Sequence, residues 1–225
     1  MIVVLASRHD QVAAALVARW PTAALCSAED LTRRGWAWAA QSNGSAAKWV
    51  IGGEIVPDEH VTGVFVRRST VYSEELTRTH PDDRVYLAAE THAFLAFVLS
   101  RTAARVINPV DDGGTYGEAA LRPERWMQAA IEAGVAAAPL RVRSAGRQHA
   151  PARATSFEVV GERVLGNSGS PLAAAALEVC RCLGLGWAVA SFDHGGRLSA
   201  ITTTPAPSPP AATALAKILA NKRVA

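Results

Sequence analysis

The chain has 225 residues, of which 49% are apolar and 19% charged, and its formal net charge is +3. This length and composition are typical of one large globular domain or two small ones, and they argue against a disordered chain. The longest apolar runs are too short to cross a bilayer, and the apolar start of the chain lacks the basic residues of a secretory signal. We therefore expect a cytoplasmic protein with no membrane partner.

The cysteines and the basic residues indicate neither a metal site nor a nucleic-acid surface. Cys26, Cys180 and Cys182 cannot form a disulfide framework, and they have no partners at zinc spacing. The basic residues are scattered and mostly lie near acids in the sequence. The acid-poor basic stretch at 141–153 has no interleaved aromatic side chains, which nucleic-acid grooves use. We expect no metal and no nucleic-acid partner.

The predicted elements of the first half alternate between strands and helices. Apolar runs predict strands and helically spaced apolar residues predict helices, in the order strand 2–6, helix 10–19, strand 23–26, a strand pair around Asn43-Gly44, strand 61–66, helix 81–103, strand 106–109 and helix 123–134. Asn43-Gly44 lies between two aromatic strand patterns and is typical of a hairpin turn. A loop at 111–117 precedes the last of these helices.

Strand pairs dominate the second half, which follows a polar segment at 144–151. Hairpins are predicted at 155–165 and at 187–203, and helices at 170–183 and 211–219. We therefore expect an α/β fold in two domains. The first, 1–143, is an open α/β sheet, and the second, 152–225, is a small α+β domain.

Three segments of the first half carry three distinct motifs in a characteristic order along the chain. They are a strand that ends in Arg67-Arg68, the tripeptide Val106-Ile-Asn108, and a helix followed by Ala133-Gly-Val135 and Pro139. These motifs resemble the pre-ATP-grasp half of the RimK-like and peptide-maturase ATP-grasp ligases. In the second half, 156–164 and 183–193, with a strand around Ile201, are similar to strands of the second ATP-grasp subdomain. The resemblance spans nearly the whole chain. It implies a pre-ATP-grasp-like sheet followed by a remnant of the C-terminal ATP-grasp subdomain.

The sequence departs from that family where Mg-ATP is held. Such ligases activate a carboxylate with ATP, and the resemblance implies lysines and an acid–x–Asn set that balance the phosphate charge. No lysine lies between Lys48 and Lys217. About fifteen residues separate Pro139 from Thr155, too few for the lysine-bearing subdomain. Thr202-Thr-Thr204 stands where the acid–x–Asn is expected. Asp193 alone would hold magnesium poorly, so we expect no nucleotide or metal cofactor.

Four residues are candidates for ligand binding. Arg67 and Arg68 follow a buried strand, at the end where α/β folds bind ligands, and one of them could clamp a carboxylate or a phosphate. In the alternative, one arginine pairs with a local acid such as Glu74 and the other is solvated. Asn108 faces the same crevice or orders the loop that follows it. Tyr116, in that loop, could bind a cation or an amine or belong to a solvated turn.

No catalytic residue is assigned with a role. Asp193 and His194 are candidates for an acid–base pair, but they lie at a predicted hairpin tip, where Asp is favoured in any case, and no third orienting group follows in sequence. Trp36, Trp38 and Trp49 are expected to cover a sheet face, although an exposed tryptophan face would suit a protein partner.

Three functional hypotheses follow. The first is a truncated, non-catalytic ATP-grasp-like protein: a binding or accessory subunit in a peptide- or metabolite-modifying pathway. Its partners would be a peptide or a small carboxylate, a protein, and a second copy of the chain in a homodimer. The second is an ATP-dependent carboxylate–amine ligase with an unusual or dimer-completed nucleotide site, in which arginines at 141–153 replace the lysines. The third is an unrelated enzyme that uses Arg67, Asp193 and His194.

Overall fold

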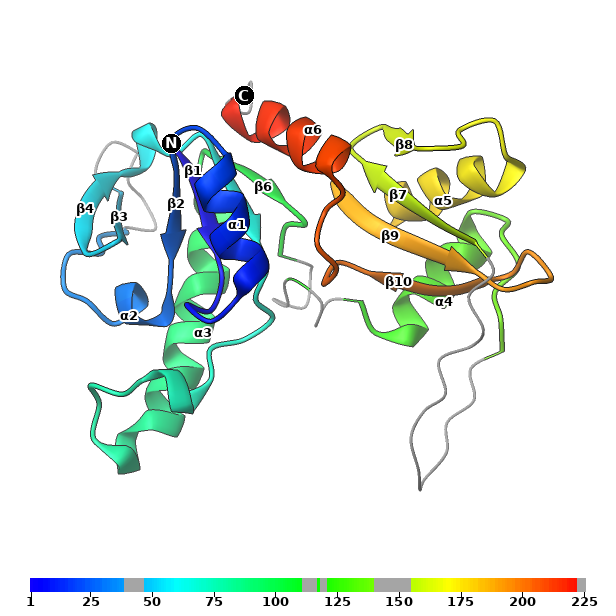
Figure 1. Ribbon diagram of the computed structural model, residues 1–225. Coiled ribbons are helices and arrows are strands. Elements are labelled where there is room, and N and C mark those ends of the chain that lie inside the picture. The colour runs from blue at the N-terminus through cyan, green and yellow to red at the C-terminus, as the bar shows by residue number, and fades with distance from the viewer. Residues whose placement is uncertain (39–46, 111–116, 118–120, 140–154, 222–225) are drawn as a thin grey trace. The chain divides into compact units, whose positions relative to one another are not determined.

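A computed structural model describes residues 1–38, 47–110, 117, 121–139 and 155–221. They form two compact units, Met1–Ala120 with Ala212–Ala225, and Leu121–Ala211 (Figure 1). The predicted hairpin turn at Asn43-Gly44 and the predicted linker at 144–151 lie outside the described residues. The domain boundaries expected at 143 and 152 therefore stay a prediction.

The first unit is built on a parallel sheet of four strands. They are β1 (Ile2–Leu5), β2 (Ala23–Cys26), β5 (Gly63–Val66) and β6 (Arg105–Ile107), and their order is β2-β1-β5-β6. Short apolar runs form these strands because both faces of such a sheet are covered. From β1 the chain moves to β2 on one side and later to β5 on the other. The strand order therefore reverses between β1 and β5, at the point where open α/β sheets bind ligands.

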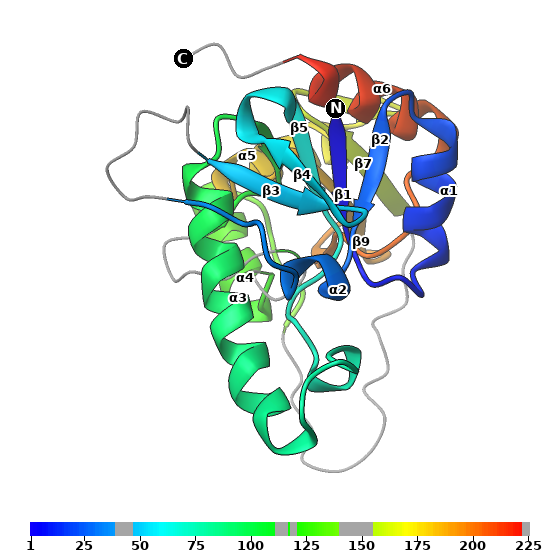
Figure 2. The same cartoon turned by 90° about the vertical axis from the view of Figure 1, so that its left-hand side faces the viewer.

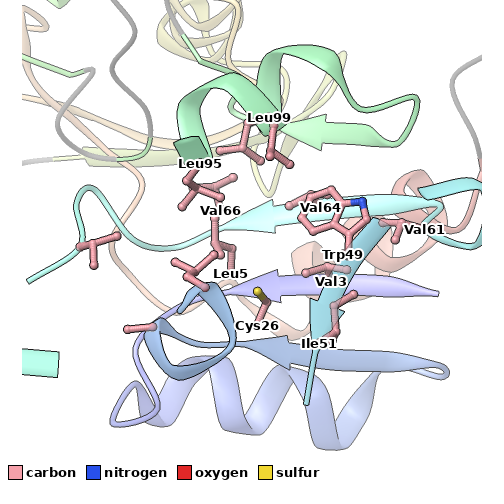
Figure 3. Close-up of a cluster of buried hydrophobic side chains, with 14 of the residues drawn as sticks. Val3, Leu5, Cys26, Trp49, Ile51, Val61, Val64, Val66, Leu95 and Leu99 are labelled. Atoms are coloured by element: carbon pink, nitrogen blue, oxygen red, sulfur yellow. The ribbon is translucent and has the colours of Figure 1, made fainter. Parts of the chain in front are cut away.

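One face of this sheet is covered by α3 (Arg84–Arg101) and by the hairpin of β3 (Lys48–Ile51) and β4 (Glu54–Pro57) (Figure 2). Trp49 from β3 packs with Val3, Val64 and Leu95 in a continuous apolar core (Figure 3). Trp36 and Trp38 lie 5.5 and 5.9 Å from the Trp49 ring, measured between centroids. The three tryptophans therefore cover the sheet face, as predicted.

The opposite face is covered by α1 (Gln11–Arg19) and by α6 (Pro209–Ala220), the last helix that the structure describes (Figure 2). The Trp20 ring meets Phe65 of β5 edge-on, and its Nε1 donates to the carbonyl of Ala212 at 2.9 Å. A Cβ at Gly63 would lie 2.5 Å from the carbonyl oxygen of Leu219, so α6 needs a glycine beneath it. From Ala212 onward α6 therefore belongs to the first unit, although its first residues, Pro209 to Ala211, belong to the second.

Short elements connect these layers. They are α2 (Ala28–Leu31) and the 3-10 turns η1 (Asp58–His60), η2 (Ser73–Glu75) and η3 (Pro81–Asp83). In η1, the buried Asp58 carboxylate accepts from Trp49 Nε1 at 2.7 Å and from Thr102 Oγ1 at 2.6 Å. This carboxylate joins the β3–β4 hairpin to the C-terminal end of α3.

The second unit is an antiparallel sheet with helices on one face. Its strands are β7 (Thr155–Val160), β8 (Arg163–Leu165), β9 (Trp187–Phe192) and β10 (Leu198–Thr202), in the order β10-β9-β7-β8. Alternate residues such as Phe157 and Val159 face α4 (Pro123–Glu132) and α5 (Pro171–Cys182) in a second core. The two predicted hairpins are confirmed. The predicted fold class, an open α/β sheet followed by a smaller α+β unit, is also confirmed.

Neither a disulfide nor a spanning helix occurs in the described parts of the chain. Cys26, Cys180 and Cys182 are free thiols, the first two of them buried. Burial raises the pKa of the Cys180 thiol to about 12. No described helix has the length and apolar character needed to cross a membrane.

Candidate functional site

The carboxyl ends of the four parallel strands meet at one edge of the sheet, which we call the carboxyl edge. Residues 7–10 follow β1, Ser27 follows β2, Arg67 and Arg68 follow β5, and Asn108 follows β6. The sequence candidates Arg67, Arg68 and Asn108 are therefore brought to the same edge. This edge contains the reversal point between β1 and β5, where ligands bind in this class of sheet.

The two arginines after β5 point to opposite faces of the sheet. Successive side chains of a strand alternate, so Arg67 follows the direction of Phe65, toward α1, and Arg68 that of Val66, toward α3. Arg67 Nε donates to Asp10 Oδ2 at 2.8 Å, and Arg68 Nη2 donates to a carboxylate oxygen of Glu75. Their side chains are only 6% and 4% exposed. Each guanidinium is therefore buried with a carboxylate.

This arrangement corrects one part of the sequence interpretation. The local acid that binds an arginine is Glu75 and not its neighbour Glu74, and neither arginine is solvated. In the turn η2, Glu75 also accepts from the Tyr72 amide at 3.2 Å, which directs this carboxylate, rather than that of Glu74, toward the sheet. Whether Arg67 or Arg68 binds a ligand stays a prediction.

Asp10 joins the start of α1 to Arg67 at the end of β5. It is the N-cap of α1, where Oδ1 accepts from the amides of Val12 at 2.9 Å and Ala13 at 3.0 Å. Its second oxygen holds Arg67. One carboxylate thus satisfies the free N–H groups of a helix start and neutralises a buried arginine 57 residues away in sequence.

Arg68 lies among groups whose protonation it affects. Its Nε donates to the Thr70 carbonyl at 2.9 Å, while its buried Nη1 has no acceptor among the described residues. Burial and the nearby Arg68 charge both lower the pKa of His92 on α3. Burial, together with the charge of Asp30, raises the pKa of the Cys26 thiol far above its usual range, although Arg68 acts in the opposite direction.

Asn108 and Gly117 shape the backbone beside the arginines. Asn108 is 2% exposed and has a φ of 58°, a left-handed conformation that asparagine tolerates better than most residues. Gly117 has a φ of 60°, and a Cβ there would lie 2.5 Å from the Arg68 carbonyl oxygen. The backbone therefore turns at Asn108 after β6, and Gly117 lies against the end of β5. Tyr116 lies outside the described residues.

A cavity of about 190 Å³ opens at the carboxyl edge within the first unit. It is lined by Arg8, His9, Ser27, Ala28, Glu29, Glu74 and Glu75. Across it, Arg8 Nη1 contacts Glu29 Oε1 at 2.7 Å. Sequence reasoning missed this cavity as a site. Its only signal was the run of polar residues 7–10 directly after a buried strand.

Asp193 and His194 lie in the turn between β9 and β10. Asp193 Oδ1 accepts from the amides of Arg197 and Gly195, both at 2.9 Å, and Oδ2 accepts from Arg197 Nε at 2.9 Å. These bonds, the Arg197 amide bond first, lower the pKa of the Asp193 carboxyl. The geometry fits a carboxylate that organises its own turn, with His194 exposed beside it.

The end of β10 offers hydroxyl groups. Thr202 and Thr204 are joined by a bond of 2.8 Å between their Oγ1 atoms. Over the described residues, no group of three or more His, Cys, Asp or Glu side chains is placed to hold a metal ion. The residues at this strand end therefore do not fit the ligand set that the resemblance implies for magnesium.

Comparison with solved structures identifies the class of fold. The macrocyclase MdnC bound with precursor peptide MdnA, from Microcystis aeruginosa MRC, aligns over 99% of this chain and 100% of its own, with a TM-score of 0.67 and 13% identity. The ATP-grasp ligase PsnB complexed with minimal precursor, Mg and ADP covers 91% of this chain and 89% of its own, with a TM-score of 0.61 and 11% identity. A RimK domain ATP-grasp protein from Sphaerobacter thermophilus DSM 20745 covers 97% and 98%, with a TM-score of 0.53 and 14% identity.

The chain therefore has the fold of the ATP-grasp ligases, as the sequence resemblance predicted. No protein-family model matches the chain, and no curated protein matches it. At these identities the likeness concerns the fold, and function has to be argued from the residues.

Proposed function

We propose that this protein is a non-catalytic binding subunit with an ATP-grasp-like fold, and that it binds a peptide as an accessory component of a peptide-modifying pathway. The observation that carries the proposal is the pairing of both carboxyl-edge arginines with internal carboxylates, in a fold whose usual task is to hold Mg-ATP. Phosphoryl transfer depends on cations that are aimed at the phosphates. Arg67 and Arg68 are instead engaged by Asp10 and Glu75.

The remaining phosphate chemistry supports the same proposal. No lysine lies between Lys48 and Lys217, so nearly the whole fold is built without the residue that usually meets β- and γ-phosphates. At the strand end of the second unit, Asp193 is held by Arg197 and the neighbouring residues are threonines. Some structurally similar proteins hold precursor peptides, which is why a peptide is favoured over a small carboxylate or another metabolite.

The first test is titration of the purified chain with ATP, with and without Mg²⁺, by calorimetry. The proposal expects neither heat of binding nor a shift in melting temperature at millimolar ATP. Magnesium-dependent binding would overturn it and favour the alternative, an ATP-dependent carboxylate–amine ligase. In that alternative, arginines of the segment 141–153, outside the described residues, replace the missing lysines.

The second test addresses the peptide. The immobilised protein is panned against a phage-displayed library of random peptides, and enriched sequences are synthesised and titrated by fluorescence anisotropy. A shared motif that binds in solution supports the proposal, whereas the absence of any enriched binder overturns it. We also propose a homodimer, for which sedimentation equilibrium should give twice the mass of the chain.

A further inference from the structure

Helix α3 is apolar on the side that faces away from the sheet, which we call its outward face and which is formed by Tyr86, Ala89, Ala93 and Phe97. These residues recur at helical spacing, so they project on one side of the helix. Tyr86 is 71% exposed and Phe97 is half-buried. Over residues 85–100, Glu90 is the only Asp, Glu, Lys or Arg. The buried residues of α3 lie on its other side and are Ala88, Thr91, Leu95, Val98 and Leu99.

This pattern differs from that of an ordinary surface helix. A helix with one solvated side carries polar residues there, whereas a helix that is apolar all round is covered by another element. The N-terminal turns of α3 extend past the strands of the first unit (Figure 1, Figure 2). Val85 and Tyr86, which project in different directions, are accordingly 72% and 71% exposed. The outward face is therefore suited to packing against a further helix.

Charges at the two ends of α3 indicate which helix that is. Asp82, in the turn η3 just before α3, is 89% exposed. Arg101, the last residue of the helix, is exposed, and its guanidinium carbon lies 5.9 Å from the centroid of the Phe97 ring. In an antiparallel pair of α3 helices with a two-fold axis between positions 91 and 92, Asp82 of one copy lies at the height of Arg101 of the other. The axis forms this acid–base pair twice, so the charges are complementary to those of a second copy.

The apolar residues fit the same pairing. Tyr86 of one copy lies at the height of Phe97 of the other, which brings two aromatic rings together at each end. Ala89, Ala93 and Phe97 form a row of residues four apart, and rows of that spacing interdigitate when helices pack. The two alanines let the backbones approach each other near the axis. Glu90 opposes the association, because its two copies lie on the same rim of the pair, close to the axis.

We propose that the outward face of α3 binds a second copy of this chain in an antiparallel, two-fold pair of α3 helices. This inference rests on the proposed homodimer and assigns its interface. Helix α3 has 18 residues, so it is about 27 Å long and about 10 Å wide. Its face is therefore smaller than the roughly 800 Å² per partner of a standard stable interface. The dissociation constant of the dimer should accordingly lie in the micromolar range.

The test exchanges the end charges and follows the mass of the full chain by sedimentation equilibrium, at concentrations from below to above the dissociation constant. Asp82→Arg alone places two arginine pairs in the dimer, and Arg101→Glu alone places two acidic pairs. Each variant should therefore weaken the dimer about tenfold. An equimolar mixture of the two variants should restore the original affinity, because the mixed dimer contains two unlike pairs. That restoration would also show that both variants are folded.

A second variant tests the position of the two-fold axis. Glu90→Gln should strengthen the dimer about threefold, because it removes the repulsion between the two copies of Glu90. Glu132→Gln is the matched control, since Glu132 is an exposed acid on α4 of the second unit, and it should leave the affinity unchanged.

The outcomes separate this inference from the proposals on which it rests. A dimer that neither end-charge variant weakens would overturn this inference and leave the homodimer standing. A dimer that both variants weaken and their mixture does not restore would overturn the antiparallel pairing. A chain that stays monomeric at every concentration would overturn the homodimer itself, while the peptide-binding function is decided by its own titration.

Discussion

Single residues decide how the carboxyl edge is held together. Burying a guanidinium without a partner costs several kcal/mol of free energy by order of magnitude, so each buried arginine needs a carboxylate beside it. Asp10 and Glu75 meet this requirement from opposite faces of the sheet. Such pairs do not add much stability over an apolar core, but removing one partner leaves a charge stranded.

Replacement of Asp10 by Asn isolates the effect of that pair. Asparagine caps a helix about as well as aspartate, so the start of α1 is preserved while the carboxylate charge that Asp10 places beside Arg67 is removed. We expect Asp10→Asn to lower the free energy of unfolding by about 3 kcal/mol, measured by urea denaturation. Asp82→Asn is the control, because that carboxylate is 89% exposed and should contribute less than about 0.5 kcal/mol. Equal small losses in both variants would show that the Asp10 pair behaves as a surface pair.

Protonation of His92 gives a pH-dependent prediction. Its pKa in the folded protein lies below the usual 6.5, owing to burial and to Arg68. As the pH falls below about 6.5, the unfolded chain takes up a proton that the folded chain resists, so stability falls with pH. The urea midpoint of the protein should therefore drop between about pH 7.5 and about pH 5.5. His92→Gln should flatten that drop, while substitution of its exposed neighbour, Ala93→Gln, should leave the drop intact.

At the scale of elements, periodicity predicted most of the fold. Apolar runs predicted strands at 2–6 and 61–66, and an apolar stripe predicted a helix at 81–103, because burial on a face leaves a repeat in the sequence. The structure has these elements at 2–5, 63–66 and 84–101. The carboxyl edge also followed, since strands of one parallel sheet end together. The expectation that arginines lie at that edge was therefore sound.

What the sequence could not supply were pairings between distant or equivalent residues. Asp10 and Arg67 are 57 residues apart, and no local pattern couples them. Glu74 and Glu75 are chemically identical neighbours, and only the backbone of η2 selects one of them. The cavity was missed for the same reason, because its lining comes from three segments that are separate in sequence. An apolar stripe on a helix also does not say which sheet that stripe covers.

Close packing of α6 on β5 gives a prediction at this scale. Gly63 has ordinary backbone angles, but a Cβ there would meet the backbone of Leu219 at 2.5 Å. Gly63→Ala should therefore push α6 away and cost about 1–3 kcal/mol, as overpacking does. Gly169→Ala is the control, because the nearest atom to its added Cβ is 3.9 Å away and its effect should be small. Both are measured as changes in the urea midpoint, and a tolerated Gly63→Ala would contradict this packing.

The whole molecule is organised so that one unit is discontinuous in sequence. The first unit comprises Met1–Ala120 and Ala212–Ala225, and the second is inserted between them. Each unit has its own apolar core. A substitution that destabilises the packing of α6 should therefore destabilise the parallel sheet of the first unit, rather than the second unit.

The double substitution Leu215→Ala with Leu219→Ala tests that organisation. Both leucines are fully buried, and each truncation should cost about 2–5 kcal/mol. Hydrogen exchange should show lost amide protection in β1 and β5, while β7 and β9 keep theirs. Lys217→Gln, on the exposed side of the same helix, should change neither set. Equal loss of protection in both units would mean that they unfold as one.

The position of α6 also has a consequence during synthesis. A chain leaves the ribosome from its N-terminus, so β1, α1 and β5 emerge long before the helix that covers Phe65 and Trp20. Throughout translation of the second unit, α1 alone covers that sheet face, and the apolar surface on which α6 will pack stays exposed, which invites aggregation. The sheet of the first unit is therefore completed only after the whole second unit has been synthesised.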